Sequence, residues 1–137
     1  MKILFLLAFS FIGFVSNAQT DYLVNDSSEY FQKPLKVAQI MPEFVGGEKA
    51  MMNYIGQNLS YPINAIESYL EGTVKLRFTV TRTGKIINPK VISEVLGGGL
   101  EEEAIRVLNS MPNWKPGKQK GKAVAVYFEL PFKFKIN

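Results

Sequence analysis

The chain has 137 residues, with 16 lysines and arginines against 12 aspartates and glutamates, and it contains no histidine and no cysteine. A chain of this length corresponds to one domain, with or without a tail. Because histidine and cysteine are absent, cysteine–histidine zinc clusters, cysteine nucleophiles, haem attachment and Ser-His-Asp triads are excluded. The composition still allows catalysis by carboxylates, calcium or magnesium sites with oxygen ligands, and functions that involve no catalysis.

The first 18 residues have the pattern of a secretory signal peptide. Lys2 supplies a basic start, residues 3–15 are almost wholly apolar, and Ser16-Asn17-Ala18 places small residues before a cleavage point. The alternative is an uncleaved membrane anchor. Thirteen helical residues reach only about 20 Å, against about 30 Å of hydrocarbon core. We therefore predict an exported protein, cleaved after Ala18, with no stable membrane span afterwards.

Residues 19–36 show no hydrophobic period and contain the polar run Asn25-Asp26-Ser27-Ser28. Such a segment is typical of a flexible tail or linker. We expect the folded domain to occupy residues 37–137. It has no cysteine to form a disulfide, so its stability must come from a packed core, which a domain of this size can supply.

Two helices are expected in the first half of the domain. The segment from Glu48 to Leu59 follows a Gly-Gly turn and repeats apolar residues at the spacing of one helical face. Pro62 fits the first turn of a second short helix that runs through Leu70, because the first turn needs no N–H from that residue. Gly72 lies where a glycine that ends a helix belongs.

A β-hairpin is expected next. Over residues 73–81 apolar and polar side chains alternate, which is the pattern of a strand with one face in water. Thr83-Gly84 supplies a short connection, and a second strand returns over residues 86–95. Asn88-Pro89 interrupts the second strand, which indicates a bulge or an edge position.

A glycine triplet at residues 97–99 precedes a third helix. Residues 100–111 carry apolar side chains on one helical face. The run Glu101-Glu102-Glu103 falls in the first turn, where the helix macrodipole favours negative charge. Successive helical residues point in different directions, so we interpret these glutamates as a solvated face and expect no metal site.

The final segment, residues 123–136, shows the clearest pattern of the chain. All its even positions are apolar, whereas its charged residues occur only at odd positions. Pro131 cannot donate a ladder hydrogen bond, so its missing donor should face away from the partner strand. We predict one long edge strand, or two strands that meet at Pro131. An edge strand exposes unpaired backbone groups that can pair with another chain.

Together these elements predict an α+β fold, in which helices pack on one face of a small antiparallel sheet of about three main strands. The acidic residues are scattered along the sequence, so a hydrolase that uses paired carboxylates has little support. We expect the protein to have no enzymatic activity and to bind no cofactor. A basic turn beside Trp114 is the feature that nucleic acid would need; its residues are Lys115, Lys118, Lys120 and Lys122. The net charge is small and the protein is expected to be exported, so we expect solvated lysines and no nucleic-acid partner.

Six short motifs follow one another between Met41 and the C-terminus: Phe44-Val45-Gly46-Gly47-Glu48-Lys49-Ala50, Tyr61-Pro62-x-x-Ala65, Glu71-Gly72-Thr73-Val74, Thr83-Gly84-Lys85-Ile86, Met111-Pro112-x-Trp114-x-Pro116-Gly117 and Leu130-Pro131-Phe132. In the order and spacing of these motifs, the chain from Met41 onward resembles the TonB C-terminal domain. Val45 departs from the proline that relatives usually have in the first motif.

The resemblance implies a periplasmic, non-enzymatic module that binds the TonB box, a short extended peptide of outer-membrane receptors, and contributes to energy-coupled transport. In the family this peptide adds a strand beside the last strand and near the segment before Tyr-Pro. Backbone pairing would supply affinity, and alternate side chains selectivity. The positions implied to bind the peptide are Asn58, Ser60, Tyr61, Pro62, Ala125, Tyr127 and Glu129. The last three are expected to share the solvent-facing side of the strand.

A complete TonB also has a membrane anchor with a functional histidine and a long proline-rich spacer. This chain has no histidine, and its 18-residue predicted tail spans at most about 60 Å. It therefore resembles the receptor-facing part of the family. The alternative is an envelope structural or assembly protein that forms a homodimer, or binds another partner, through the same edge strand.

Overall fold

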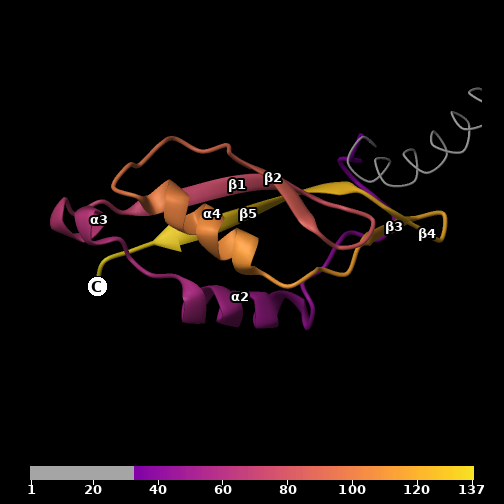
Figure 1. The fold of residues 1–137 in the computed structure, drawn as a ribbon, viewed down its shortest axis with the longest axis horizontal. Coiled ribbons are helices and arrows are strands. Elements are labelled where there is room, and N and C mark those ends of the chain that lie inside the picture. The colour runs from indigo at the N-terminus through magenta and orange to yellow at the C-terminus, as the bar shows by residue number, and fades with distance from the viewer. Residues whose placement is uncertain (1–32) are drawn as a thin grey trace, which may run out of the picture. The chain divides into compact units, whose positions relative to one another are not determined.

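The computed structural model describes residues 33–137; the predicted signal peptide and most of the predicted tail lie outside the described residues. The helices are α2 (Gly47–Asn58), α3 (Ile63–Glu67) and α4 (Leu100–Ser110). The strands are β1 (Gly72–Val80), β2 (Ile86–Val91), β3 (Gly117–Gln119), β4 (Lys122–Val124) and β5 (Val126–Phe134) (Figure 1). None of the helices in this part of the chain is long and apolar enough to cross a membrane.

Strands β2, β1 and β5 form a three-stranded antiparallel sheet in the order β2-β1-β5. β1 is therefore the central strand, and β5 lies at one edge although it is last in the chain. The β1–β5 ladder is regular from the Val80–Val126 pair to the Gly72–Phe134 pair. The sheet and the helices confirm the predicted α+β fold.

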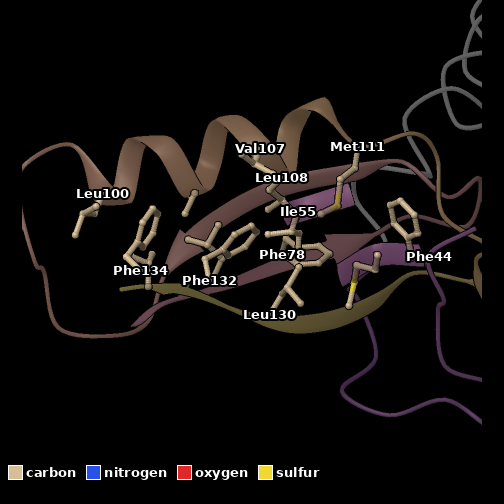
Figure 2. Close-up of a cluster of buried hydrophobic side chains, with 14 of the residues drawn as sticks. Phe44, Ile55, Phe78, Leu100, Val107, Leu108, Met111, Leu130, Phe132 and Phe134 are labelled. Atoms are coloured by element: carbon tan, nitrogen blue, oxygen red, sulfur yellow. The ribbon is translucent and has the colours of Figure 1, made fainter. Parts of the chain in front are cut away.

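The core lies between the sheet and the helices, as Figure 2 shows for α4 and the strands beneath it. Every second side chain of β1 and β5 points to this side, because side chains alternate across a strand. The fully buried members from the sheet and α4 include Val74, Leu76, Phe78, Phe132, Leu100, Val107 and Leu108. The apolar pattern of residues 123–136 thus sets which face of β5 is inside.

Two side-chain hydrogen bonds join the C-terminal half of α2 to the C-terminal half of α4. The Tyr54 hydroxyl donates to the Ser110 carbonyl oxygen at 2.7 Å. Arg106 Nη2 donates to the Asn58 carbonyl oxygen, also at 2.7 Å. α2 buries Met51 and Ile55 against the common core. The two helices are therefore held together as one layer on the sheet.

The β1–β2 hairpin follows the prediction, including its irregularity. Its turn is closed by hydrogen bonds from the Thr81 N–H to Lys85 and from the Gly84 N–H to Thr81. The register shifts between Arg77 and Thr79. Opposite this shift Asn88 has a φ of 54°, a left-handed conformation that asparagine tolerates better than most residues. The bulge predicted at Asn88-Pro89 is confirmed.

The end of α3 differs from the prediction. The helix stops at Glu67, and Tyr69 takes the left-handed conformation that ends it, with a φ of 51°. The Tyr69 N–H donates to Ile66 and the Leu70 N–H donates to Ala65, which is the Schellman pattern. Gly72 has a φ of 149° and begins β1 instead. The role predicted for Gly72 was wrong because the helix ends several residues earlier.

The glutamates at the start of α4 are not a uniform solvated face, so that prediction was wrong. Glu101 and Glu103 are only 7% and 9% exposed. The Glu101 carboxylate accepts hydrogen bonds from the backbone N–H groups of Leu96 and Gly97, at 3.0 and 2.9 Å. The glycine loop folds back over the first turn of the helix, and Glu101 secures it there.

The final segment is divided at a different place from the one predicted. Pro131 lies inside the continuous strand β5, so the alternative of two strands meeting at Pro131 was wrong; the break falls at Ala125, between β4 and β5. The lysine-rich turn that precedes it folds as the β3–β4 hairpin. Lys120 and Gly121 form its two-residue connection, both with positive φ, as a type I′ turn requires.

A pair of glycine substitutions tests the packing of the β1–β2 turn. A Cβ on Gly84, whose φ is +88°, would lie 2.0 Å from the Trp114 carbonyl oxygen, whereas a Cβ on Gly121, whose φ is +75°, would meet nothing within 4 Å. We expect Gly84→Ala to lower the free energy of unfolding by about 3 kcal/mol or more. Gly121→Ala should cost only the backbone strain, about 1 kcal/mol. Equal losses in urea unfolding would contradict this account.

Candidate functional site

The outer edge of β5 is the feature that can receive another chain. β1 occupies the inner edge along the whole strand. In an antiparallel ladder, consecutive residues direct their backbone N–H and C=O groups to opposite edges. The Tyr127 N–H points outward, since it donates to the Leu35 carbonyl oxygen at 2.9 Å. By this alternation, the odd-numbered residues of β5 present their backbone groups outward, and the even-numbered residues bond to β1.

Pro131 falls on an odd position, so its missing N–H lies on the outer edge and removes no hydrogen bond from the β1–β5 ladder. The structure confirms this expectation from the sequence. A proline at an outward position is the arrangement that edge strands tolerate. It leaves the outer edge of β5 with two N–H donors beyond Tyr127, from Glu129 and Lys133, and with carbonyl acceptors from Tyr127 to Lys133.

These outward groups are open in the part of the chain that the structure describes. No backbone group among residues 33–137 bonds to the outward N–H or C=O groups of Glu129, Pro131 or Lys133. The exception on this edge is at its start. There Leu35 forms a parallel bridge with Val126, donating its N–H to the Ala125 carbonyl oxygen and accepting from Tyr127. The open stretch therefore begins at the Tyr127 carbonyl and extends to Lys133.

Charged residues on the solvent face of the sheet hold the Glu129 side chain away from this edge. Arg77 is the direct cross-strand neighbour of Glu129 on β1. Its Nη2 lies 2.8 Å from Glu129 Oε1, and Lys75 Nζ lies 3.6 Å from Oε2. The hydrogen bond from Arg77, aided by the charge of Lys75, lowers the pKa of the Glu129 carboxyl. The carboxylate thus reaches back over β1 and leaves the outer backbone accessible.

The segment before α3 lies at the other end of β5. Tyr61 packs edge-to-face on Phe134, with ring centroids 5.6 Å apart, and its hydroxyl donates to the Leu70 carbonyl oxygen. Partial burial of the Tyr61 hydroxyl, with Glu71 nearby, raises its pKa. Asn58 and Ser60 are exposed, whereas Tyr61 and Pro62 are half-buried. Tyr61 therefore anchors this segment beside the end of the sheet.

The residues predicted to bind a peptide do not form one cluster. Tyr61 contacts Phe134, whereas Ala125 and Tyr127 lie near the first residue of β5. About eight residues of strand, or roughly 26 Å, separate the two groups. They flank the open edge at its two ends, so an extended chain that follows the edge could reach both.

One predicted side-chain position was wrong. Ala125 was expected to face solvent with Tyr127 and Glu129, yet it is only 5% exposed. The chain is irregular at Ala125, between β4 and β5, so the alternation of β5 does not extend to it. Tyr127 is half-buried and Glu129 is exposed. What Ala125 offers on the outer edge is its carbonyl oxygen, which Leu35 already occupies.

Sequence reasoning missed two residues that shape the edge. Leu35 pairs with Val126 from more than ninety positions away, and a single bridge leaves no periodic signal in the sequence. Arg77 was recognised only as a polar residue of an alternating strand, and the register that sets it opposite Glu129 is a property of the fold. Among residues 33–137, no group of acidic side chains is placed to hold a metal ion.

The pKa of Glu129 offers a test of this charged face. Because the pKa of Glu129 is lower in the folded state, its charged form stabilises the fold at pH values above its unfolded-state pKa, near 4.5. This stabilisation is lost as the pH falls through the folded-state pKa. We expect Arg77→Gln to raise the pKa of Glu129 toward its ordinary value, as measured by carboxyl NMR titration. Lys133→Gln, which removes a positive charge from the same strand, is the matched control. An unchanged Glu129 pKa in Arg77→Gln would contradict the assignment.

Comparisons with known proteins found a family model and a similar solved structure. The family model for the C-terminal domain of the Gram-negative bacterial TonB protein matches residues 57–136. The solution structure of the Helicobacter pylori TonB C-terminal domain is similar, with 20% identity and a TM-score of 0.44, over 64% of this chain and 79% of that one. No curated protein matched. Since the family model covers more than half of the 137 residues, the chain belongs to the TonB C-terminal domain family.

Proposed function

We propose that this domain binds an extended peptide of an outer-membrane receptor by β-strand addition at the outer edge of β5, and so contributes to energy-coupled transport across the outer membrane. The family makes the domain a TonB-like, transport-related module. The observation that carries the finer proposal is the open run of outward backbone groups from Tyr127 to Lys133. An exposed sheet edge of this kind is a template for an added strand.

The outer edge of β5 offers a partner strand more hydrogen-bond acceptors than donors. Its open groups are the N–H donors of Glu129 and Lys133 and the carbonyl oxygens of Tyr127, Glu129, Pro131 and Lys133. An added strand would receive two hydrogen bonds from these donors and give its own N–H groups to the carbonyls. Pro131 leaves one position on the partner without a donor. Backbone pairing then supplies affinity without requiring a particular side chain at each position.

Side chains beside the edge would supply the selectivity. On the solvent face the added strand would lie next to Tyr127, Glu129, Pro131 and Lys133. Arg77 and Lys75 together outweigh the single charge of Glu129, and none of the ion pairs seen among residues 33–137 involves Lys133, so the face keeps a net positive charge that includes Lys133 at its far end. Opposite charges on neighbouring strands stabilise a sheet, and like charges destabilise it. The partner peptide is therefore expected to carry polar or acidic residues at that end, near Tyr61.

The proposed location follows from the family and from the N-terminal sequence. Family members work in the periplasm, and residues 1–18 carry the signal-peptide pattern. There the domain would meet receptor segments that reach inward from the outer membrane. Its task is binding by backbone hydrogen bonds, for which the chain needs neither a cofactor nor a catalytic group.

Proline substitutions on the outer edge test the proposal. Lys133→Pro removes an outward N–H and leaves the β1–β5 ladder intact, because the bonds to β1 come from even-numbered residues. Lys133→Ala removes the same side chain but keeps the N–H. We expect Lys133→Pro to weaken binding of a TonB-box peptide roughly fivefold or more relative to Lys133→Ala, the effect of about 1 kcal/mol for one hydrogen bond. Isothermal titration calorimetry measures the difference.

The outcomes separate the proposal from its alternative. Absence of TonB-box binding by the unmodified protein, or equal affinities of Lys133→Pro and Lys133→Ala, would contradict strand addition at this edge. If the edge instead joins two copies of the domain, light scattering would show a concentration-dependent homodimer that the peptide does not dissociate. Urea unfolding of both variants verifies that the ladder with β1 remains intact.

A further inference from the structure

The chain already places one of its own segments on the edge that the proposed function requires. Leu35 lies beside Val126 in parallel orientation, with the Leu35 N–H to Ala125 O and Tyr127 N–H to Leu35 O bonds both at 2.9 Å. A strand added to β5 would lie about 4.8 Å from it, in the same plane. Leu35 and a partner strand therefore cannot both occupy the edge at Ala125 and Tyr127.

Leu35 is held on β5 by a single bridge, whereas the residues from Gln39 to Glu43 are hydrogen-bonded to the β3–β4 region at three positions. The Leu35 side chain is 37% exposed, and Val37, two residues later, is 76% exposed. Beyond this point the chain is fixed to the β3–β4 region. Ile40 exchanges two backbone hydrogen bonds with Lys118, and Glu43 exchanges two with Lys115. The end at Leu35 can therefore leave β5 while residues 40–43 stay in place.

We propose that residues 33–36 act as a built-in competing strand, which caps the start of the β5 edge through Leu35 and must be displaced before a partner can pair with its full length. The inference rests on the proposed function and concerns the regulation of the same site. A short partner pairs with the open stretch from Glu129 to Lys133. A longer partner gains the Tyr127 N–H and the Ala125 carbonyl oxygen only by displacing Leu35. The segment around Leu35 thus sets how long a partner strand can be before its binding requires Leu35 to leave β5.

This device belongs to the part of the chain outside the family match. The match begins at residue 57, whereas the competing segment lies more than twenty residues earlier. The register also limits its effect to one end of the edge. Ala125 and Tyr127 are the positions that Leu35 bonds, and the Tyr61–Phe134 contact lies at the opposite end of β5. Peptide contacts near Tyr61 should therefore be independent of residues 33–36.

The test compares two proline variants of the full chain with two peptides. Leu35→Pro removes the N–H that bonds to Ala125. Val37→Pro is the matched control, because Val37 is exposed and no described residue hydrogen-bonds to its N–H. The probes are a TonB-box peptide of about five residues, which can span only the open stretch, and an extended version of about nine residues that can reach Ala125.

We expect Leu35→Pro to bind the longer peptide about fivefold more tightly than the unmodified protein, because one or two competing hydrogen bonds no longer have to break. The shorter peptide should bind both proteins equally, and Val37→Pro should match the unmodified protein with either peptide. In the free protein, hydrogen exchange of the Tyr127 amide should be faster in Leu35→Pro than in Val37→Pro.

Each result that differs from these expectations would contradict a specific step of the proposal. Unchanged affinity for the longer peptide in Leu35→Pro, while both peptides still bind, would show that the segment does not compete and would leave the proposed function standing. An equal gain for both peptides would assign the effect to a change elsewhere in the domain. No binding of either peptide to any variant would refute the proposed function, and the competition with it. Tyr127 exchange, which needs no peptide, then reports separately whether Leu35 occupies the edge.

Discussion

The antiparallel pairing of β1 with β5 is the interaction on which the rest of the structure depends. Because its register is regular from the Val80–Val126 pair to the Gly72–Phe134 pair, the even-numbered side chains of both strands point into the core beneath α2 and α4. The same register directs the backbone groups of the odd-numbered β5 residues away from the sheet. The last strand of the chain therefore stabilises the fold through one edge and presents hydrogen-bonding groups to a partner through the other.

Much of this arrangement could be predicted because it follows from local alternation. The apolar even positions of residues 126–134 fix the buried face of β5, and Pro131 fixes which edge can lack a donor. The alternation of β1 and the Asn88-Pro89 irregularity of β2 have the same local origin. An edge strand open to another chain is thus readable from the sequence, together with the element order that resembles the TonB C-terminal domain.

What could not be predicted depends on contacts between residues distant in the chain. Ala125 is buried where the chain breaks between β4 and β5, and the alternation of apolar and polar residues in the sequence continues through this position without marking the break. Glu101 is buried because the preceding loop folds onto its carboxylate. The β3 and β4 strands have three residues each, too few to show a period. The Leu35 bridge, which narrows the open edge to the stretch beyond Tyr127, leaves no local pattern.

The central claim is that a partner strand pairs with the outer backbone groups of β5. Amide hydrogen exchange of the unmodified protein, with and without a saturating TonB-box peptide, tests it residue by residue. The amides of Glu129 and Lys133, which face outward, should gain protection on binding. Those of Leu130 and Phe132, which bond to β1, should be protected in both states. Unchanged exchange at Glu129 and Lys133, with new protection on another element, would contradict the account.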